Sequence, residues 1–100
     1  MSLKVYYTQP AKETLLILYT SIQSKFGKRS ADKFLLKVEK TVDLISEFPL
    51  MFKSSSIDEN VRVGLITRQS SVFYRVTDES ITLLFFWDTR QEPFFTYLPE

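Results

Sequence analysis

The segment from Ile81 to Trp87 limits the possible folds more than any other part of the chain. Side chains alternate in direction along a strand. Both of the resulting sets are largely apolar here: Ile81, Leu83, Phe85 and Trp87 on one side, and Thr82, Leu84 and Phe86 on the other. A strand with one face in water carries polar residues on that face. The sequence therefore predicts a sheet whose two faces are both covered.

Two helices are predicted upstream of this strand. Apolar residues recur at helical spacing from Ala11 to Phe26, after Pro10, which suits a first turn. Gly27 is placed to end this helix. Ser30 is a plausible N-cap for the second helix, which ends before Pro49. Its predicted apolar face contains Phe34, Leu35, Val38, Val42 and Ile45. The short link predicts an antiparallel helix hairpin.

Three further strands are predicted from residues that alternate with a period of two, over Leu3–Tyr7, Val61–Leu65 and Val72–Val76. The serine-rich segment Leu50–Asn60 is expected to be an exposed loop, and Thr77–Ser80 a tight turn. The predicted fold is α+β. It consists of an N-terminal strand, the helix hairpin on one face of the sheet, and a three-stranded antiparallel meander, all in one domain over residues 1–100.

The helix hairpin can cover only one face of this sheet, so something else must cover the second face. The chain offers one candidate of its own, an apolar C-terminal segment with Phe94, Phe95, Tyr97 and Leu98. The other candidate is a separate protein that folds on binding. We expect this segment, together with Trp87, to bind a partner; a tail that folds back as ordinary core is the alternative.

The chain contains neither cysteine nor histidine. This excludes disulfides, zinc sites of Cys and His, thiolate nucleophiles and histidine general bases. No metal site and no cofactor is expected. The net charge is only +1, and phosphate contacts usually require a stronger basic excess, so binding of free nucleic acid is not expected. No apolar run approaches the roughly 20 residues that span a bilayer, so no membrane contact is expected and the default location is cytoplasmic.

Two short motifs, in this order, resemble the RelE/ParE toxin superfamily, which includes plasmid stabilisation proteins. The first is Phe73-Tyr74-Arg75-Val76-Thr77-Asp78, and the second is Trp87-Asp88-Thr89-Arg90-Gln91-Glu92-Pro93 after the last strand. The resemblance covers essentially the whole chain. It implies a helix hairpin on a curved antiparallel sheet, a cognate antitoxin whose tail wraps the toxin, and a target that is either DNA gyrase or the ribosome.

The two branches of the superfamily differ in mechanism. RelE-like members cleave mRNA in the ribosomal A site with basic residues on the sheet and a tyrosine near the C-terminus. The resemblance places Tyr97 at the position of this tyrosine and Arg90, or its neighbour Gln91, near that of a catalytic arginine. The sheet arginine expected three residues before Tyr74 is Ser71 in this chain. Arg62 or Arg68 could replace it from the adjacent strand.

ParE-like members bind gyrase and lack this catalytic set. We therefore expect a ParE-like toxin that inhibits growth by binding its target. A ribosome-dependent endoribonuclease is the first alternative, and a non-toxic member that only binds antitoxin is the second. Each candidate also has an ordinary structural explanation: Arg90 could pair with Asp88 or Glu92, and Tyr97 could pack in the tail. The lysines of the helix hairpin could meet an acidic antitoxin or nucleic acid, but a solvated helix face is expected.

Overall fold

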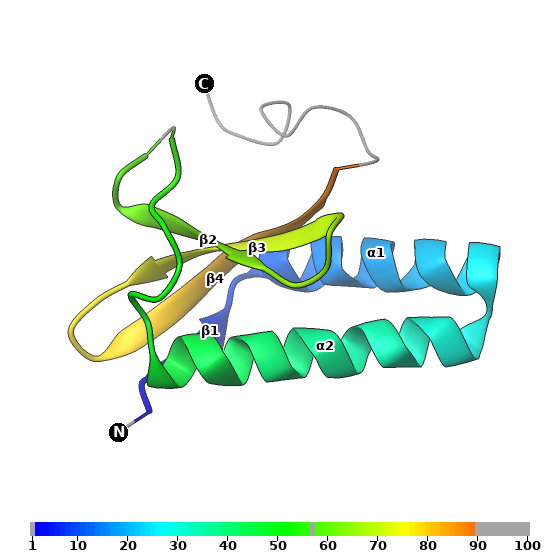
Figure 1. Ribbon diagram of the computed structural model, residues 1–100, viewed down its shortest axis with the longest axis horizontal. Coiled ribbons are helices and arrows are strands. Elements are labelled where there is room, and N and C mark those ends of the chain that lie inside the picture. The colour runs from blue at the N-terminus through cyan, green and yellow to red at the C-terminus, as the bar shows by residue number, and fades with distance from the viewer. Residues whose placement is uncertain (1, 57, 90–100) are drawn as a thin grey trace.

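The computed structural model describes residues 2–56 and 58–89. Its elements, in chain order, are β1 (Lys4–Tyr7), α1 (Gln9–Phe26), α2 (Lys28–Glu47), β2 (Val61–Leu65), β3 (Ser70–Val76) and β4 (Ser80–Asp88). The helices lie together on one face of a four-stranded sheet (Figure 1). The predicted α+β arrangement of a strand, a helix hairpin and an antiparallel meander is therefore confirmed.

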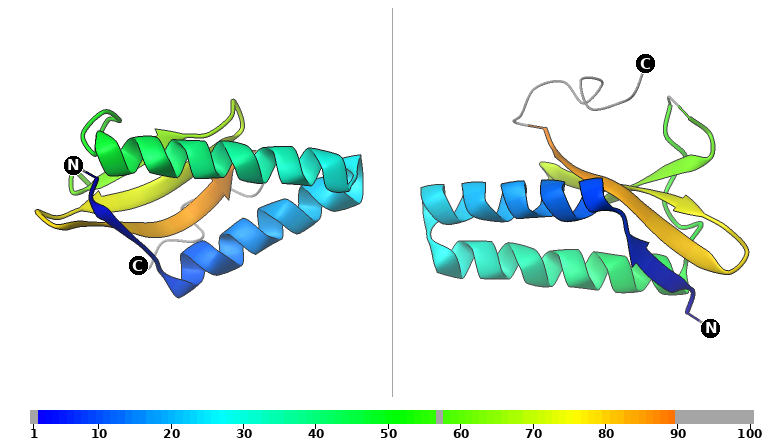
Figure 2. Two further views of the ribbon diagram at one scale, coloured as in Figure 1. Left: turned by 90° about the horizontal axis from the view of Figure 1, so that it is seen from below. Right: turned by 180° about the vertical axis from the view of Figure 1, so that it is seen from behind.

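The sheet has the strand order β1-β4-β3-β2. The pairs β2–β3 and β3–β4 are antiparallel, whereas β1 runs parallel to β4, with Val5 opposite Ile81. A parallel pair needs a crossover connection between its two strands, and the helix hairpin provides the first part of it. Seen from below and from behind, β1 lies beside β4 at the edge of the sheet (Figure 2).

α1 begins and ends where its local sequence predicts. Thr8 is the N-cap: its hydroxyl oxygen accepts a hydrogen bond of 3.1 Å from the backbone N–H of Ala11. Gly27 ends the helix with φ = 94°, a backbone conformation that favours glycine. α2 then begins at Lys28, so Gly27 is also its N-cap and the backbone N–H of Ala31 bonds to the Gly27 carbonyl. The predicted N-cap at Ser30 is wrong, because one glycine serves both helices.

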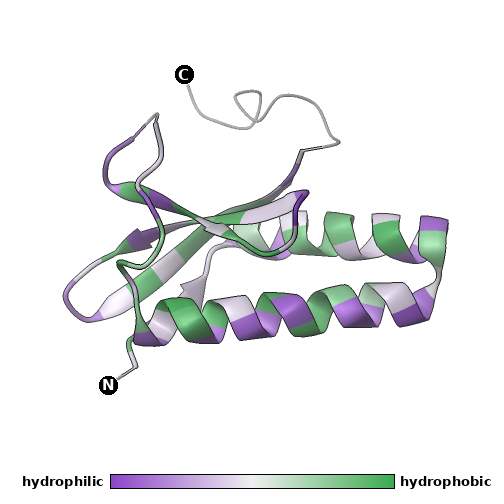
Figure 3. Ribbon diagram, in the orientation of Figure 1, coloured by the Kyte–Doolittle hydropathy of each residue, from purple (hydrophilic) through white to green (hydrophobic). Residues whose placement is uncertain are grey.

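The apolar residues form two clusters on opposite faces of the sheet. The helix-side core includes Leu18, Phe34, Val38 and Ile45 from the helices, with Val72, Tyr74 and Leu83 from the sheet. α2 supplies it with residues three and four positions apart, and the alternation of apolar and polar residues along this helix is visible in Figure 3. The outer cluster, on the other face, has Val61, Phe73 and Trp87 at its centre, with Val63, Leu84 and Phe85 packed against them.

A β-bulge in β4 changes which residues share a face. Phe73 lies opposite Phe85, but its neighbour Tyr74 lies opposite Leu83, so Leu84 is an extra residue. The alternation therefore restarts at Leu84: Leu83 and Phe86 both belong to the helix-side core. The prediction that Phe85 and Trp87 share a face with Ile81 and Leu83 is wrong, because a period of two does not continue through an inserted residue.

Side chains of α1 complete the edge of β4 beyond the end of β1. The hydroxyl of Thr14 accepts a hydrogen bond of 2.8 Å from the backbone N–H of Phe86. The hydroxyl of Thr8 lies 2.8 Å from the carbonyl oxygen of Leu83 and 3.0 Å from that of Leu84, on either side of the bulge. An uncovered strand edge is a template for pairing with another chain. These two threonines protect part of the edge from such pairing.

Candidate functional site

The outer cluster is the surface that the sequence links most directly to function. Val61, Phe73 and Trp87 are 8%, 6% and 7% exposed. The rings of Phe73 and Phe85 stack with their centroids 4.5 Å apart and their planes inclined by 16°. The prediction of a sheet that is apolar on both faces is confirmed, although the residues of β4 divide between the faces differently.

Ser71 lies three residues before Tyr74, at the position where the resemblance to RelE-like members implies an arginine. It lies opposite Trp87 in the β3–β4 pair and is 8% exposed. By strand alternation it shares the outer face with Phe73. This part of the face therefore has a small buried hydroxyl beside aromatic rings, where the nuclease mechanism calls for a cation that stabilises developing charge.

The predicted site residues are only partly brought together. Trp87 belongs to the outer cluster, and little of its ring reaches the surface. Arg90, Phe94, Phe95, Tyr97 and Leu98 lie outside the described residues. Their predicted roles in catalysis or partner binding remain predictions.

Arg62 lies at the start of β2 and is half-buried. Its Nη1 donates a hydrogen bond of 2.6 Å to the carbonyl oxygen of Phe52, in the segment that follows α2. Burial raises the pKa of the Tyr74 hydroxyl, and the positive charge of Arg62 partly opposes this rise. That hydroxyl donates to the carbonyl oxygen of Pro49, so both side chains hold this segment against the sheet.

Of the other two arginines of the meander, Arg75 shares a cavity with Arg62, and Arg68 does not line that cavity. Arg68 is exposed in the turn between β2 and β3, beyond the end of β2, the strand that contains Arg62. Arg75 lies 3.9 Å from the carboxylate of Asp58. Arg62 and Arg75 line one open cavity of about 850 Å³, whose lining also contains Glu59 and Asp78. Its charges are balanced, unlike those of a phosphate site.

A second, apolar hollow of about 350 Å³ lies between the helices. It is lined by Tyr7, Lys12, Leu15, Leu16, Tyr19 and Leu35. Burial raises the pKa of the Tyr7 hydroxyl, and the carboxylates of Glu39 and Asp43 raise it further. The Tyr7 ring also stacks on Phe86 at a centroid distance of 6.4 Å, which links the hollow to the sheet.

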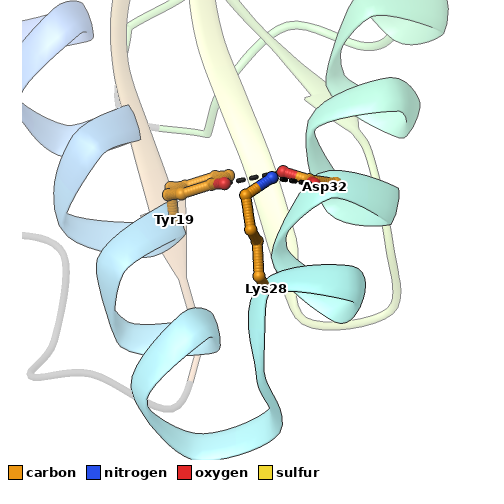
Figure 4. A network of polar contacts seen from close by, with 3 residues as sticks. All are labelled: Tyr19, Lys28 and Asp32. Atoms are coloured by element: carbon orange, nitrogen blue, oxygen red, sulfur yellow. Dashed lines mark hydrogen bonds and ion pairs between the residues drawn. The ribbon is translucent and has the colours of Figure 1, made fainter.

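Tyr19 connects this hollow to a polar network at the start of α2 (Figure 4). Its hydroxyl donates a hydrogen bond of 2.6 Å to the carboxylate of Asp32, which also pairs with the Lys28 ammonium at 2.7 Å. Hydrogen bonds from Lys28 and from Tyr19 lower the pKa of Asp32. The spacing of Lys28 and Asp32 is detectable in the sequence as an i, i+4 pair. The contact with Tyr19 is not, because it joins two helices.

Within residues 2–56 and 58–89, no group of three or more carboxylates, histidines or cysteines is arranged to hold a metal ion. No helix in this part of the chain is long and apolar enough to cross a membrane.

Comparison with known proteins points to one family. A family model described as the ParE toxin of the type II toxin–antitoxin system parDE matches residues 5–93. No curated protein sequence matches the chain. The chromosomal ParDE toxin–antitoxin system from P. aeruginosa contains a chain with a TM-score of 0.74 and 19% identity, over 87% of this chain and 96% of that one.

Two other solved structures share the fold. A chain of the E. coli DinJ–YafQ toxin–antitoxin complex has a TM-score of 0.63 and 9% identity, with 90% of this chain and 96% of that one covered. A chain of the YoeB dimer from Staphylococcus aureus has a TM-score of 0.61 and 16% identity, with 85% of this chain and 94% of that one covered. At these identities the likeness concerns the fold alone.

Proposed function

This chain belongs to the ParE toxin family of type II toxin–antitoxin systems, and on that premise we propose that it arrests bacterial growth by binding DNA gyrase and is held inactive by a cognate antitoxin. The alternative within the same fold is RNA cleavage on the ribosome. The two mechanisms require different surfaces. A nuclease needs fixed cations near the reacting phosphate, whereas a binding protein needs an apolar surface whose shape is complementary to its target.

The single observation that carries this proposal is the buried Ser71 beside Phe73 and Trp87. The one sheet arginine that the resemblance to RelE-like members implies here is Ser71, which is 8% exposed and lies on the same face as the buried rings of Phe73 and Trp87. The neighbouring arginines have other contacts, since Arg62 donates to the Phe52 carbonyl and Arg75 lies beside Asp58. These features favour action by binding over action by cleavage.

The first experiment is controlled expression in a bacterial host. We expect induction of the chain alone to stop growth, and co-expression of the neighbouring reading frame to restore it. Linear plasmid trapped in covalent complexes with gyrase should accumulate, while the 5′ ends of cellular transcripts stay unchanged. Growth that continues despite folded, soluble protein would identify a member that only binds antitoxin.

Two substitutions separate the mechanisms within the chain. Arg90→Ala and Tyr97→Phe remove the groups that a RelE-like nuclease would use, so we expect both variants to remain toxic and to trap gyrase. New transcript ends inside codons, lost in these variants together with toxicity, would establish the nuclease mechanism and contradict the proposal.

A further inference from the structure

A concave surface lies where the turn between β2 and β3 meets the two helices. It consists of two hollows, of about 280 Å³ and 460 Å³, that share Lys37, Thr67 and Gln69 in their linings. We call it the basic concavity and define it by the cations Lys33, Lys37 and Arg68 and by the apolar floor Ile22, Phe26 and Phe34. Figure 1 shows this turn descending from the sheet toward the helices.

The charge of the basic concavity is not compensated by the described part of the chain. No aspartate or glutamate lines either hollow. Among residues 2–56 and 58–89, the ion pairs join Lys28 to Asp32 and Arg75 to Asp58, so neither involves Lys33, Lys37 or Arg68. Asp32, the neighbour of Lys33 in the sequence, is held by Lys28 and Tyr19.

Two further features strengthen the preference for a negative group. Ser30, in the first turn of α2, lines the smaller hollow, so the positive end of the α2 dipole lies beside it. The N-cap of α2 is Gly27, which has no side chain to accept hydrogen bonds from the first backbone N–H groups. An acidic side chain of a partner would meet both the cations and this helix end.

The floor of the basic concavity is apolar and partly accessible. The Phe26 side chain is 62% exposed, although it borders the buried ring of Phe34. Burying such a ring against a partner stabilises the complex by the hydrophobic effect. Three cations around an apolar floor match a peptide with acidic residues and one large apolar side chain. A nucleic acid requires a longer series of phosphate contacts, and the net charge of +1 disfavours it.

We propose that the basic concavity binds an acidic segment of the cognate antitoxin and that an apolar side chain of that segment packs against Phe26. This proposal rests on the proposed function, because it takes the antitoxin as the partner. It assigns Lys33 and Lys37, for which the sequence predicted a solvated helix face, to partner binding together with Arg68 of the turn between β2 and β3.

The test compares two charge-reversal variants of the full chain by isothermal titration calorimetry with purified antitoxin. The triple variant K33E/K37E/R68E reverses the concavity, and the matched control K4E/K40E/K53E reverses three exposed lysines elsewhere. We expect the first to weaken binding about 30-fold or more, since three ion pairs are lost and repulsion is added. The control should change affinity less than about 3-fold.

The salt dependence gives a readout that a merely structural role does not affect. Raising the ionic strength should weaken binding of the unmodified chain, and this dependence should be much smaller for K33E/K37E/R68E. Phe26→Ala removes an exposed ring without opening the core, so we expect binding that is several-fold weaker with an unchanged salt dependence. Circular dichroism melts establish that each variant is folded.

The remaining outcomes overturn the proposal in distinguishable ways. Equal losses in both triple variants would assign the effect to net charge, and no loss in either would place the antitoxin on another surface; in both cases the proposed function stands. A single-stranded RNA oligonucleotide whose binding is lost in K33E/K37E/R68E, while antitoxin affinity is retained, would make the surface a nucleic-acid site. An antitoxin that does not bind the unmodified chain would contradict the proposed function as well.

Discussion

Individual side chains of the sheet hold a segment without regular secondary structure in place. Arg62 and Tyr74 are neighbours across the β2–β3 pair, and they contact the carbonyl oxygens of Phe52 and Pro49. Both carbonyls belong to the segment after α2; the sequence predicts an exposed loop from Leu50 onward and takes Pro49 only as the end of the helix. The candidate role of Arg62 in catalysis could be read from the sequence, but its structural partner could not, because backbone carbonyls carry no sequence signal.

We expect Arg62→Met to lower the free energy of unfolding by about 1–2 kcal/mol, because a hydrogen bond from a charged, half-buried group is lost. Urea denaturation measures this loss, and Arg62→Lys is the control that retains the charge. Toxicity should persist at temperatures where the variant is folded. Unchanged stability together with lost toxicity would instead assign Arg62 to the functional surface.

The network of Tyr19, Lys28 and Asp32 makes stability depend on pH in a defined direction. The folded state lowers the pKa of Asp32 from 3.8, so this contribution is present above that pH and is lost as the pH falls through the folded value. Folding also raises the pKa of Lys28 and the pKa of Tyr19, because both side chains donate hydrogen bonds to Asp32. The stability that these two groups contribute is therefore lost as the pH rises through their pKa values in the folded protein.

The corresponding variant is Asp32→Asn. We expect the difference in stability from the unmodified chain to be largest between about pH 5 and pH 9 and to shrink toward both extremes. Thermal melts across the pH range measure it. In a Lys28→Met background the acidic decline should be smaller, because the main cause of the lowered pKa is gone. A difference that is constant with pH would contradict this account.

At the scale of elements, α1 acts as the lateral cover of β4. β1 pairs only with Ser80–Leu83, and from the bulge onward the edge of β4 faces the first turns of α1. The Thr14 hydroxyl bonds both to the Pro10 carbonyl of its own helix, at 2.7 Å, and to the Phe86 backbone N–H. Helix and strand are thus linked by one side chain.

Thr14→Val keeps the shape of the side chain but leaves the N–H of Phe86 without its acceptor. We expect a loss of about 1–2 kcal/mol in the free energy of unfolding and faster hydrogen exchange at the Phe86 amide. Thr14→Ser, which retains the hydroxyl, should restore both values to near those of the unmodified chain. Equal exchange rates in the valine and serine variants would show that the contact contributes nothing.

The elements themselves were predictable because each has a strong local signal. Pro10 and Gly27 mark the ends of α1, and the period changes from helical spacing to alternation after Asn60. The errors arose where one residue has two roles or interrupts a period: Gly27 caps both helices, and Leu84 is inserted into β4. The parallel pairing of β1 with β4 has no local signal, since its partners lie about 76 residues apart.

At the scale of the molecule, the sheet separates two apolar clusters. The helix-side core joins α1, α2 and three strands, whereas the outer cluster joins β2, β3 and β4. The sequence predicted that both faces are apolar. It could not predict the basic concavity, because Phe26, Lys37 and Arg68 come from three separate elements and meet only in the folded chain.

The only tryptophan, Trp87, reports on the outer cluster. We expect its fluorescence to change at the same urea concentration as the far-ultraviolet circular dichroism of the helices, because strands shared by both clusters make unfolding cooperative. Phe73→Leu should lower the urea midpoint of the fluorescence transition and that of the circular dichroism transition by the same amount. A fluorescence transition that precedes the loss of helix would show that the outer cluster unfolds independently.

The pairing of β1 with β4 has a consequence for synthesis of the protein. β1 leaves the ribosome before the helix hairpin, whereas its partner β4 follows all the other strands and helices that the structure describes. The nascent chain can form the helix hairpin beforehand, yet its amino-terminal strand must wait, unpaired, until translation has passed Leu83. The native sheet therefore closes late, and the interval before closure is set by elongation speed.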